Sequence, residues 1–310
     1  MITFDKLLRD ARVFKALTGI TVDEFAKLYS KVEPAWVEAE SKRLSRPDRR
    51  RAIGAGSDYS LDLETRLVMV LFWLRLYLTM TAVGYFFSVD KATVSRNTRR
   101  LLPVLRQISD PEFEWSEPPG RGQGKNIERA LRDYPELFAI LDATEQPVQR
   151  SQDDEKQRAH YSGKKKRHTR KTAIVVNEHG EIRGVTFSTP GSVHDITHIR
   201  GSGILDKIPK EVGVIGDAGF DGLHKDLPDH SVATAHKARR NHPLTEDQKL
   251  INRELSSTRI IVENIFCQLK HFRILAERFR HDLDIYDDIF RTIAAIVNVR
   301  TRNRLATTIA

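Results

Sequence analysis

The segment Arg259-Ile-Ile-Val-Glu-Asn-Ile-Phe-Cys-Gln-Leu-Lys270 has the spacing of an amphipathic helix. Its apolar residues recur at intervals of three and four, as expected for a helix with one buried face. Arg259, Glu263 and Lys270 follow one another at four and seven residues, so they share one stripe of that helix. A carboxylate between two cations is usually an exposed ion-pair ladder, and the segment alone favours that interpretation.

The composition indicates a soluble chain without a membrane span. Its 310 residues are 40% hydrophobic and 30% charged, enough for two domains with separate cores or for one domain with a helical extension. The longest apolar stretch, residues 67–78, is interrupted by Arg75 and is shorter than the ~18–20 residues that a span needs. No secretory signal is visible at the first residues, so we expect a cytoplasmic protein.

Cysteine content and charge limit the kinds of site and partner that the protein can have. The single cysteine, Cys267, excludes an internal disulfide framework and a cysteine-based zinc site. The histidines are scattered and lack thiolate partners, which also argues against zinc. The net charge of +9 indicates a polyanionic partner, and nucleic acid is the leading candidate.

The first quarter of the chain is predicted to be helical and to end in a basic loop. Residues 1–45 have the pattern of short helices, and Thr21 with Glu24 has the spacing of a capping box. Residues 43–56 hold five arginines before a Gly-Ala-Gly break. A solvated linker and a segment that contacts phosphates are equally good interpretations of this loop.

Residues 61–100 have the layout of an apolar helix followed by a helix-turn-helix. We expect helices over 79–86 and 91–100, a turn over 87–90, and packing of the two helices through Val83, Phe86, Val89 and Val94. A second helix that is polar and basic in its first half suits the major groove, and the positive charge favours this over a hairpin with no DNA role. The side chains expected to face DNA are Lys91, Thr93, Ser95, Arg96, Arg99 and Arg100.

Beyond a Pro- and Gly-rich linker at 109–125, the pattern changes from helical to mixed. Strands are expected over 138–144, 172–177, 182–187 and 212–217, and helices over 195–201, 245–271 and 285–299. Three strands in meander order, a helix, a fourth strand and further helices predict a mixed sheet flanked by helices. The expected fold class is therefore α+β, with mixed strands.

Asp142 and Asp217 each end a predicted apolar strand and precede small residues. An acid in that place faces the crevice in which α/β sheets hold ligands. Two such carboxylates on adjacent strands repel each other unless a cation lies between them. With Glu263 from the long helix they would form an all-oxygen site of the kind that Mg²⁺ prefers. Each aspartate alone is better explained as a cap, but the set favours a metal site for phosphodiester chemistry.

Three further segments carry a family resemblance: His160-Tyr-Ser-Gly-Lys-Lys-Lys-Arg-His-Thr-Arg-Lys-Thr172, Pro190-Gly-Ser-Val-His-Asp195 and Gly216-Asp-Ala-Gly-Phe220. Together they resemble bacterial insertion-sequence transposases of the IS-five group and their eukaryotic relatives, the PIF/Harbinger transposases. The long helix resembles the Tyr-x2-Arg-x3-Glu-x6-Lys signature of DDE transposases through Arg259, Glu263 and Lys270, with Ser256 at the tyrosine position. The resemblance covers about residues 12–280.

The resemblance implies a ribonuclease-H-like catalytic core, preceded by an all-α helix-turn-helix domain, with a DDE triad at Asp142, Asp217 and Glu263. These residues would bind two Mg²⁺ or Mn²⁺ ions. Water would cleave a phosphodiester at the transposon end, and the freed 3′-hydroxyl would attack target DNA. Arg259 and Lys270 would hold DNA phosphates. The implied partner is double-stranded DNA, bound by a homodimer or larger assembly in a bacterial cytoplasm at the nucleoid.

Several residues beside the triad have expected supporting roles. His194 and Asp195 match a family motif; Asp195 is the main rival of Asp217 as a metal ligand, and we expect it to cap the helix that it begins. Glu145 is expected to pair with the basic hairpin. The cations of that hairpin are expected to contact the DNA backbone: Lys164, Lys165, Lys166 and Arg167, with His160, His168, Arg170 and Lys171 nearby.

The expected organisation is a helical segment over 1–56, a helix-turn-helix domain over 57–108, a linker over 109–127 and a catalytic domain over 128–310. Two alternatives to an active transposase remain. The first is a transposase-derived DNA-binding protein, against which the three acids argue, because such a protein does not need them. The second is a nuclease that only hydrolyses; the helix-turn-helix, together with Arg259 and Lys270 of the long helix, favours end-specific joining over it.

Overall fold

The computed structural model describes residues 1–45, 59–115, 138–238 and 243–309. Most of the expected basic loop and linker, and the first ten residues of the expected catalytic domain, lie outside this range. The chain forms two compact units. The first comprises Met1–Pro111, Leu269–Glu277 and His281–Ala310, and the second comprises Glu112–Gln268 and Arg278–Arg280. The end of the chain thus groups with the N-terminal helices, a division that differs from the expected boundary.

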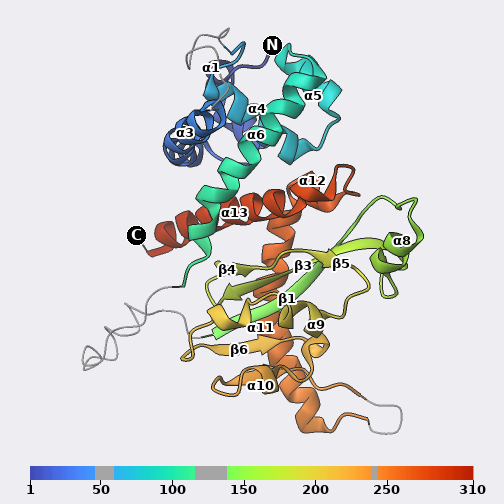
Figure 1. The fold of residues 1–310 in the computed structure, drawn as a ribbon. Coiled ribbons are helices and arrows are strands. Elements are labelled where there is room, and N and C mark those ends of the chain that lie inside the picture. Colours follow the sequence, from blue (N-terminus) through green and yellow to red (C-terminus); the bar gives the residue numbers. More distant parts are fainter. Residues whose placement is uncertain (46–58, 116–137, 239–242, 310) are drawn as a thin grey trace. The chain divides into compact units, whose positions relative to one another are not determined.

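The first unit is helical throughout its described part (Figure 1). Its helices are α1 (Phe4–Leu8), α2 (Ala11–Thr18), α3 (Val22–Leu44), α4 (Leu63–Leu76), α5 (Met80–Phe87), α6 (Lys91–Ser109), α12 (Arg273–Ala276) and α13 (Tyr286–Ile309), with short 3₁₀ turns at Asp110–Phe113 and Leu283–Ile285. The predicted capping box is present: the Glu24 amide donates to Thr21 Oγ1, and the Thr21 amide donates to Glu24 Oε2. The short-helix prediction was wrong for α3, which continues through Pro34 to residue 44.

Helix α4 forms the centre of this unit. Ten consecutive residues, from Thr65 to Leu74, are buried. A helix buried on every side needs neighbours around its circumference, and α1, α2, α3, α5, α6 and α12 all contact it. The apolar run in the sequence is therefore a core helix.

Helices α5 and α6 confirm the predicted helix-turn-helix. The Asp90 side chain accepts a hydrogen bond from the Thr93 amide, which fixes the start of α6. Val83, Phe87 and Val94 are buried between the elements. The expected role of Phe86 was wrong, because that ring is 42% exposed and Phe87 fills the core position instead.

The second unit is built on a mixed sheet that runs β2-β3-β1-β6-β7, with β4 and β5 also paired to β3 (Figure 1). Its strands are β1 (Phe138–Pro147), β2 (Tyr161–Ser162), β3 (Arg167–Asn177), β4 (Ile182–Val185), β5 (Thr189–Pro190), β6 (Gly213–Gly216) and β7 (Val232–Thr234). Strand β1 is antiparallel to β3 and parallel to β6, and β6 is parallel to β7. This is the predicted mixed sheet, and it is consistent with a ribonuclease-H-like core.

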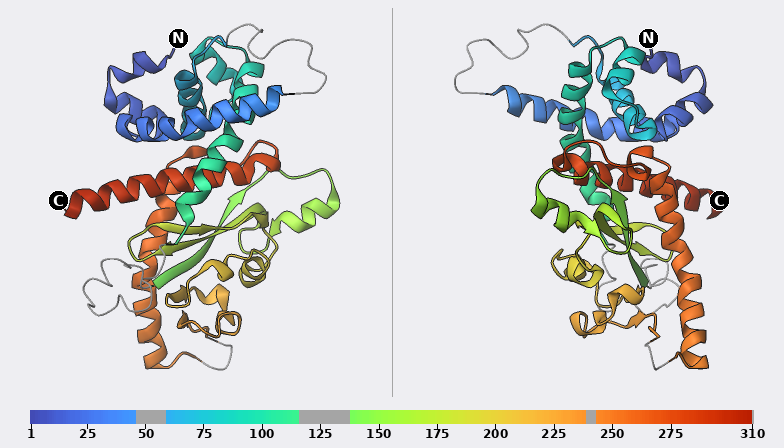
Figure 2. Two further views of the ribbon diagram at one scale, coloured as in Figure 1. Left: turned by 60° about the vertical axis from the view of Figure 1, so that its left-hand side comes forward. Right: turned by 90° about the vertical axis from the view of Figure 1, so that its right-hand side faces the viewer.

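Helices cover both faces of this sheet. Figure 2 shows α11 (Glu246–Lys270) along one face and the segment with α9 (Asp195–Arg200) and α10 (Leu223–Asp226) on the other. Side chains alternate between faces along a strand. Ala139 and Leu141 accordingly join a core with Ile199 of α9 and Leu223 of α10. Asp142 has the opposite parity, so its side chain belongs to the face of α11. Helix α8 (Asp154–His160) lies before β2.

No helix in the described part of the chain is long and apolar enough to cross a membrane.

Candidate active site

Asp142 lies where β1 loses its parallel partner. The pairing of β1 with β6 covers Phe138 to Leu141, opposite Gly213 to Gly216. Asp142 and Asp217 are the next residue on each strand, so the register brings them to the same level of the sheet. The sequence prediction ended the strand near Asp142, but β1 continues to Pro147 along β3. The two aspartates therefore lie at the end of one pairing, Asp142 inside the longer strand β1 and Asp217 just after β6.

Asp217 follows β6 and begins a 3₁₀ turn at Ala218–Phe220. Its Oδ1 accepts a hydrogen bond of 2.6 Å from the Gly219 amide. That bond caps the start of the 3₁₀ turn. Its other oxygen, Oδ2, faces Arg259 of α11.

Arg259 joins the two aspartates. Its Nη2 donates to Asp142 Oδ2 at 3.0 Å and lies 4.0 Å from Asp217 Oδ2. Its Nε is buried and has no hydrogen-bond partner among the described residues. The guanidinium therefore lies where two converging carboxylates attract a cation.

The charges of the site shift two pKa values. Burial raises the pKa of Asp142, against the hydrogen bonds from Arg259 and from the Ala143 amide, and the charge of Asp217 raises it further. Burial alone would lower the pKa of Arg259, but the bond to Asp142 and the charges of Asp142, Asp217 and Glu263 outweigh it and raise that pKa. Asp142 and Arg259 are thus electrostatically coupled.

Glu263 lies one helical turn after Arg259 on α11 and is exposed. Its charge acts on the Arg259 guanidinium, so it belongs to the same electrostatic cluster. As the described side chains stand, no three His, Cys, Asp or Glu residues lie close enough together to hold a metal ion. The available donors are carboxylate oxygens, which fit Mg²⁺ or Mn²⁺.

A buried lysine, Lys171, forms an ion pair with a further acid, Asp195. Lys171 of β3 is 5% exposed, and its Nζ lies 2.6 Å from Asp195 Oδ1 and 3.9 Å from Glu145 Oε1. Glu145 also accepts a hydrogen bond from Thr169 Oγ1. The expectation that Lys171 contacts DNA was wrong, because β3 begins at Arg167 and places Lys171 inside the sheet. The predicted pairing of Glu145 with a cation of this segment is present.

The expected capping role of Asp195 was also wrong. The N-cap of α9 is His194, which is exposed and makes no side-chain cap hydrogen bond. Asp195 is the first residue of the helix and is bound to Lys171 instead. No pattern in the sequence indicated this pair, because strand β3 was expected to begin at residue 172.

Three cations lie in the turn between β2 and β3, and a fourth, Arg167, begins β3. Lys164, Lys165, Lys166 and Arg167 are all exposed, and the Lys166 amide donates to Ser162 O to close the hairpin. Arg170, by contrast, donates to the side chain and carbonyl of Ser188. The exposed part of the predicted basic run is therefore the hairpin tip.

Some of the α6 side chains that were expected to face DNA are exposed. Lys91, Arg96 and Arg99 are exposed, while Thr93, Ser95 and Arg100 are half-buried. Arg99 pairs with Asp282 at 2.8 Å, and Arg100 donates to Tyr59 Oη.

The buried side of α6 is fixed by an arginine that the sequence did not single out. Arg66 of α4 donates to Asn97 Oδ1 at 2.6 Å. Its guanidinium lies 4.3 Å from the ring centroid of Trp36 and 4.2 Å from that of Tyr59. These contacts hold α6 against α3 and α4 and set which side chains face outward.

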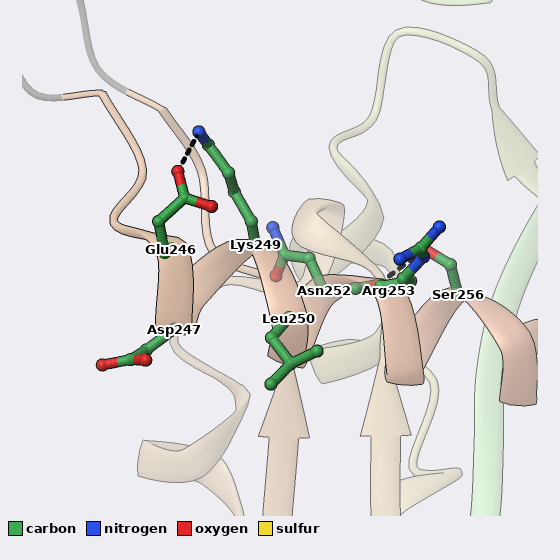
Figure 3. Close-up of a pocket in the computed structure, with 7 residues that line it drawn as sticks. All are labelled: Glu246, Asp247, Lys249, Leu250, Asn252, Arg253 and Ser256. Carbon is green, nitrogen blue, oxygen red and sulfur yellow. Dashed lines mark hydrogen bonds and ion pairs between the residues drawn. The ribbon is translucent and has the colours of Figure 1, made fainter.

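The first half of α11 lines a surface pocket that contains none of the predicted catalytic residues (Figure 3). Ser256, at the signature tyrosine position, lines it and donates to Asn252 O. Asn252 binds the His236 backbone through both its amide atoms. Lys270 is the last residue of α11, is exposed, and falls in the first compact unit.

Comparisons with known proteins give the families and relatives that the chain resembles. The helix-turn-helix of DDE superfamily endonucleases matches residues 59–111. A probable transposase for insertion sequence element IS702 from Microchaete diplosiphon is 28% identical over 274 residues, 87% of this chain and 88% of that protein. The transposase for insertion sequence element IS1106 from Neisseria meningitidis serogroup B is 32% identical over 42% of this chain and 41% of its own.

No solved structure matches the chain significantly. The family model of the DDE superfamily endonucleases matches residues 141–298, about half of the chain, and this range contains Asp142, Asp217 and Glu263. The chain therefore belongs to the DDE superfamily endonucleases.

Proposed function

We propose that this protein is a DNA transposase of the insertion-sequence type, within the IS-five group. It binds the ends of its element, hydrolyses a phosphodiester to free a 3′-hydroxyl, and joins that hydroxyl to target DNA. One observation carries the proposal: Asp142 and Asp217, from neighbouring strands, share the guanidinium of Arg259, one helical turn before Glu263. The transposase relatives and the two family matches support it.

The catalytic residues in this proposal are Asp142, Asp217 and Glu263. Their oxygens would hold two Mg²⁺ or Mn²⁺ ions, in keeping with the divalent-metal dependence of the family. When bound, such ions activate the attacking oxygen and stabilise the leaving oxygen of a phosphodiester. Burial raises the pKa of Asp142 because it disfavours the negative charge, and a bound cation would offset that cost.

Arg259 changes partner in this scheme. Its Nη2 holds Asp142, while its buried Nε has no hydrogen-bond partner among the described residues. A DNA phosphate offers oxygens to both nitrogens, because guanidinium groups bind phosphate in a bidentate way. Arg259 therefore positions the DNA strand beside the acids. Lys270 would contact the same backbone further along.

DNA binding is assigned to two surfaces. Helix α6 would enter the major groove with Lys91, Thr93, Ser95 and Arg96, and the β2–β3 hairpin would contact phosphates through residues 164–167. Joining two transposon ends requires two copies of the site, so we propose a homodimer or larger assembly on DNA. The proposed setting is the bacterial nucleoid.

A strand-joining assay tests the proposal. The protein is incubated with labelled transposon-end duplex and supercoiled target in Mg²⁺, beside Asp142→Ala and Glu263→Ala. Wild type should give joined products, and both variants should lose at least about 10²-fold in rate, as expected when a catalytic ligand is removed. Glu254→Ala, which changes an exposed acid of the same helix, is the matched control and should join normally.

The products separate the alternatives. Nicking without joining would identify a hydrolytic nuclease. Salt-sensitive binding with no metal-dependent cleavage would identify a DNA-binding protein and would overturn both enzymatic assignments.

A further inference from the structure

Asp195 lies near Oδ1 of Asp217, the oxygen that does not face Arg259. A Cβ added at Gly219 would lie 2.8 Å from Asp195 Oδ2 and 2.8 Å from Asp217 Oδ1. The two carboxylate oxygens are therefore at most twice that distance apart. Asp217 is thus placed between Arg259, toward its Oδ2, and Asp195, toward its Oδ1.

The two oxygens of Asp195 have different surroundings. Oδ1 pairs with Lys171 Nζ at 2.6 Å, and Oδ2 is the oxygen directed at Gly219 and Asp217. Lys171 is buried and also donates to Val193 O, so it cannot turn to solvent without losing both partners. Lys171 thereby anchors Asp195 through Oδ1 and leaves Oδ2 on the side of Asp217.

We propose that Asp195, held by Lys171, is a positioning residue of the metal centre: it adds negative charge beside Asp217 and increases the affinity of that centre for divalent cations. The proposal rests on the catalytic role proposed for Asp142, Asp217 and Glu263. Its chemical basis is Coulombic, because a second carboxylate a few ångströms from a cation site attracts the cation. Lys171 holds Asp195 in place through Oδ1.

The fold does not depend on the Lys171–Asp195 pair alone. His198, one turn after Asp195 on α9, bonds to Thr186 Oγ1 at 2.8 Å and to Thr189 Oγ1 at 2.9 Å. Ile199 of the same helix is fully buried in the core of the sheet. Helix α9 therefore stays on the sheet when the pair is changed, and variants of the pair can be purified and compared.

Mn²⁺ affinity, measured by titration calorimetry without DNA, is the direct readout. Asp195→Asn keeps the size of the side chain and an acceptor for Lys171 but removes the charge. It should weaken Mn²⁺ binding about tenfold. Lys171→Met removes the anchor of Asp195 and also a nearby positive charge; these effects oppose each other, so Mn²⁺ affinity should change less than in Asp195→Asn. The double variant should resemble Asp195→Asn, because Lys171 acts through Asp195.

Gly219→Ala tests the geometry without changing a charge. Its methyl group would force the two carboxylates apart, so Mn²⁺ affinity should fall. Gly163→Ala is the matched control, because a Cβ there meets nothing within 4 Å. It should bind Mn²⁺ like wild type.

Thermal unfolding in EDTA distinguishes this role from a purely structural one. If Asp195→Asn lowers the unfolding midpoint but leaves Mn²⁺ affinity unchanged, the pair is structural and the inference is wrong. Asp142→Asn separates the two proposals: if it abolishes Mn²⁺ binding while Asp195→Asn does not weaken it, only the role of Asp195 fails. If wild type binds no Mn²⁺ and cleaves no DNA, the proposed function and this inference both fail.

Discussion

Arg259 connects the two aspartates of the proposed site through one nitrogen, 3.0 Å from Asp142 and 4.0 Å from Asp217. A metal ion and this guanidinium compete for the same carboxylates. The arginine therefore has a second effect besides binding DNA: it lowers the affinity of the acids for a cation. This competition separates its role from that of an exposed ion-pair ladder, which the sequence alone favours.

Arg259→Gln tests the competition. Without the guanidinium, Mn²⁺ should bind about tenfold more tightly, because one competing positive charge has been removed. In EDTA the variant should unfold at a lower temperature, since two partly buried carboxylates lose their cation. Calorimetry and thermal unfolding measure the two effects. Arg253→Gln, an exposed position on the same helix, is the control; equal Mn²⁺ affinity in both variants would contradict the competition.

Asp142→Asn tests the cost of the buried charge. Because folding raises the pKa of Asp142, the native state binds a proton at this group more tightly than the unfolded chain does. Native stability from this group is full at acidic pH and is lost as pH rises through the folded pKa. In EDTA, the variant should therefore be more stable than wild type at neutral pH, with the difference vanishing in acid. Unfolding midpoints against pH measure this, with the exposed Asp229→Asn as control; no gain at neutral pH would contradict it.

Lys171 illustrates what a single sequence lacks at this scale. It belongs to a run of cations, and such runs are usually exposed. The alternation of β3 gives it the parity of buried Ala173 and Val175 and places it opposite Glu145. To predict this, one must know where the strand begins. The first residues of β3 are mostly basic and have no apolar pattern, so the sequence does not show where the strand starts. Asp195 lies 24 residues further along, and only the tertiary fold brings it to Lys171.

At the scale of elements, long and strongly patterned segments were predictable. Helix α11 runs from Glu246 to Lys270, close to the expected 245–271, and α5 and α6 lie where the helix-turn-helix was expected. The apolar ends of β1 and β6 also identified both aspartates. Their convergence was expected only if the two strands are adjacent; that condition follows from the parallel register of strands that are 75 residues apart at Asp142 and Asp217. Sequence patterns do not contain that register.

Helix α6 gives a prediction about DNA recognition. Arg96 is exposed, and its one described side-chain bond is to Thr93 Oγ1 on the same helix. Arg96→Ala should weaken binding to transposon ends by about 1–3 kcal/mol and leave cleavage of non-specific DNA largely unchanged. Electrophoretic mobility shift and nicking assays measure the two. Arg12→Ala, a 95% exposed side chain on α2, is the control; equal loss of both activities would argue against a recognition role.

The β2–β3 hairpin gives a prediction about non-specific binding. Replacing Lys164, Lys165 and Lys166 with Ala should weaken binding to every DNA sequence alike. The slope of log affinity against log salt should fall by about three, roughly one for each phosphate that is no longer neutralised. Fluorescence anisotropy over a salt series measures it. An unchanged slope would mean that the hairpin tip does not bind phosphates.

At the scale of the whole molecule, charge and chain path are the two features that bear on DNA binding. The net charge is +9, and exposed cations lie on α6 in one compact unit and on the β2–β3 hairpin in the other. The chain passes from the first unit to the second and returns, because α13 groups with the N-terminal helices. The sequence did not reveal that return, since the apolar pattern of a helix shows that it packs but not against which core.

The central claim is that Asp142 and Glu263 bind the catalytic metal directly. Cleavage of transposon-end DNA by Asp142→Cys and Glu263→Cys, in Mg²⁺ and in Mn²⁺, tests it most directly. Sulfur is a poor ligand for Mg²⁺ and a better one for Mn²⁺. Both variants should be inactive in Mg²⁺ and regain cleavage in Mn²⁺, while the alanine variants stay inactive in both. Cysteine variants with the same activity in either metal would contradict the claim.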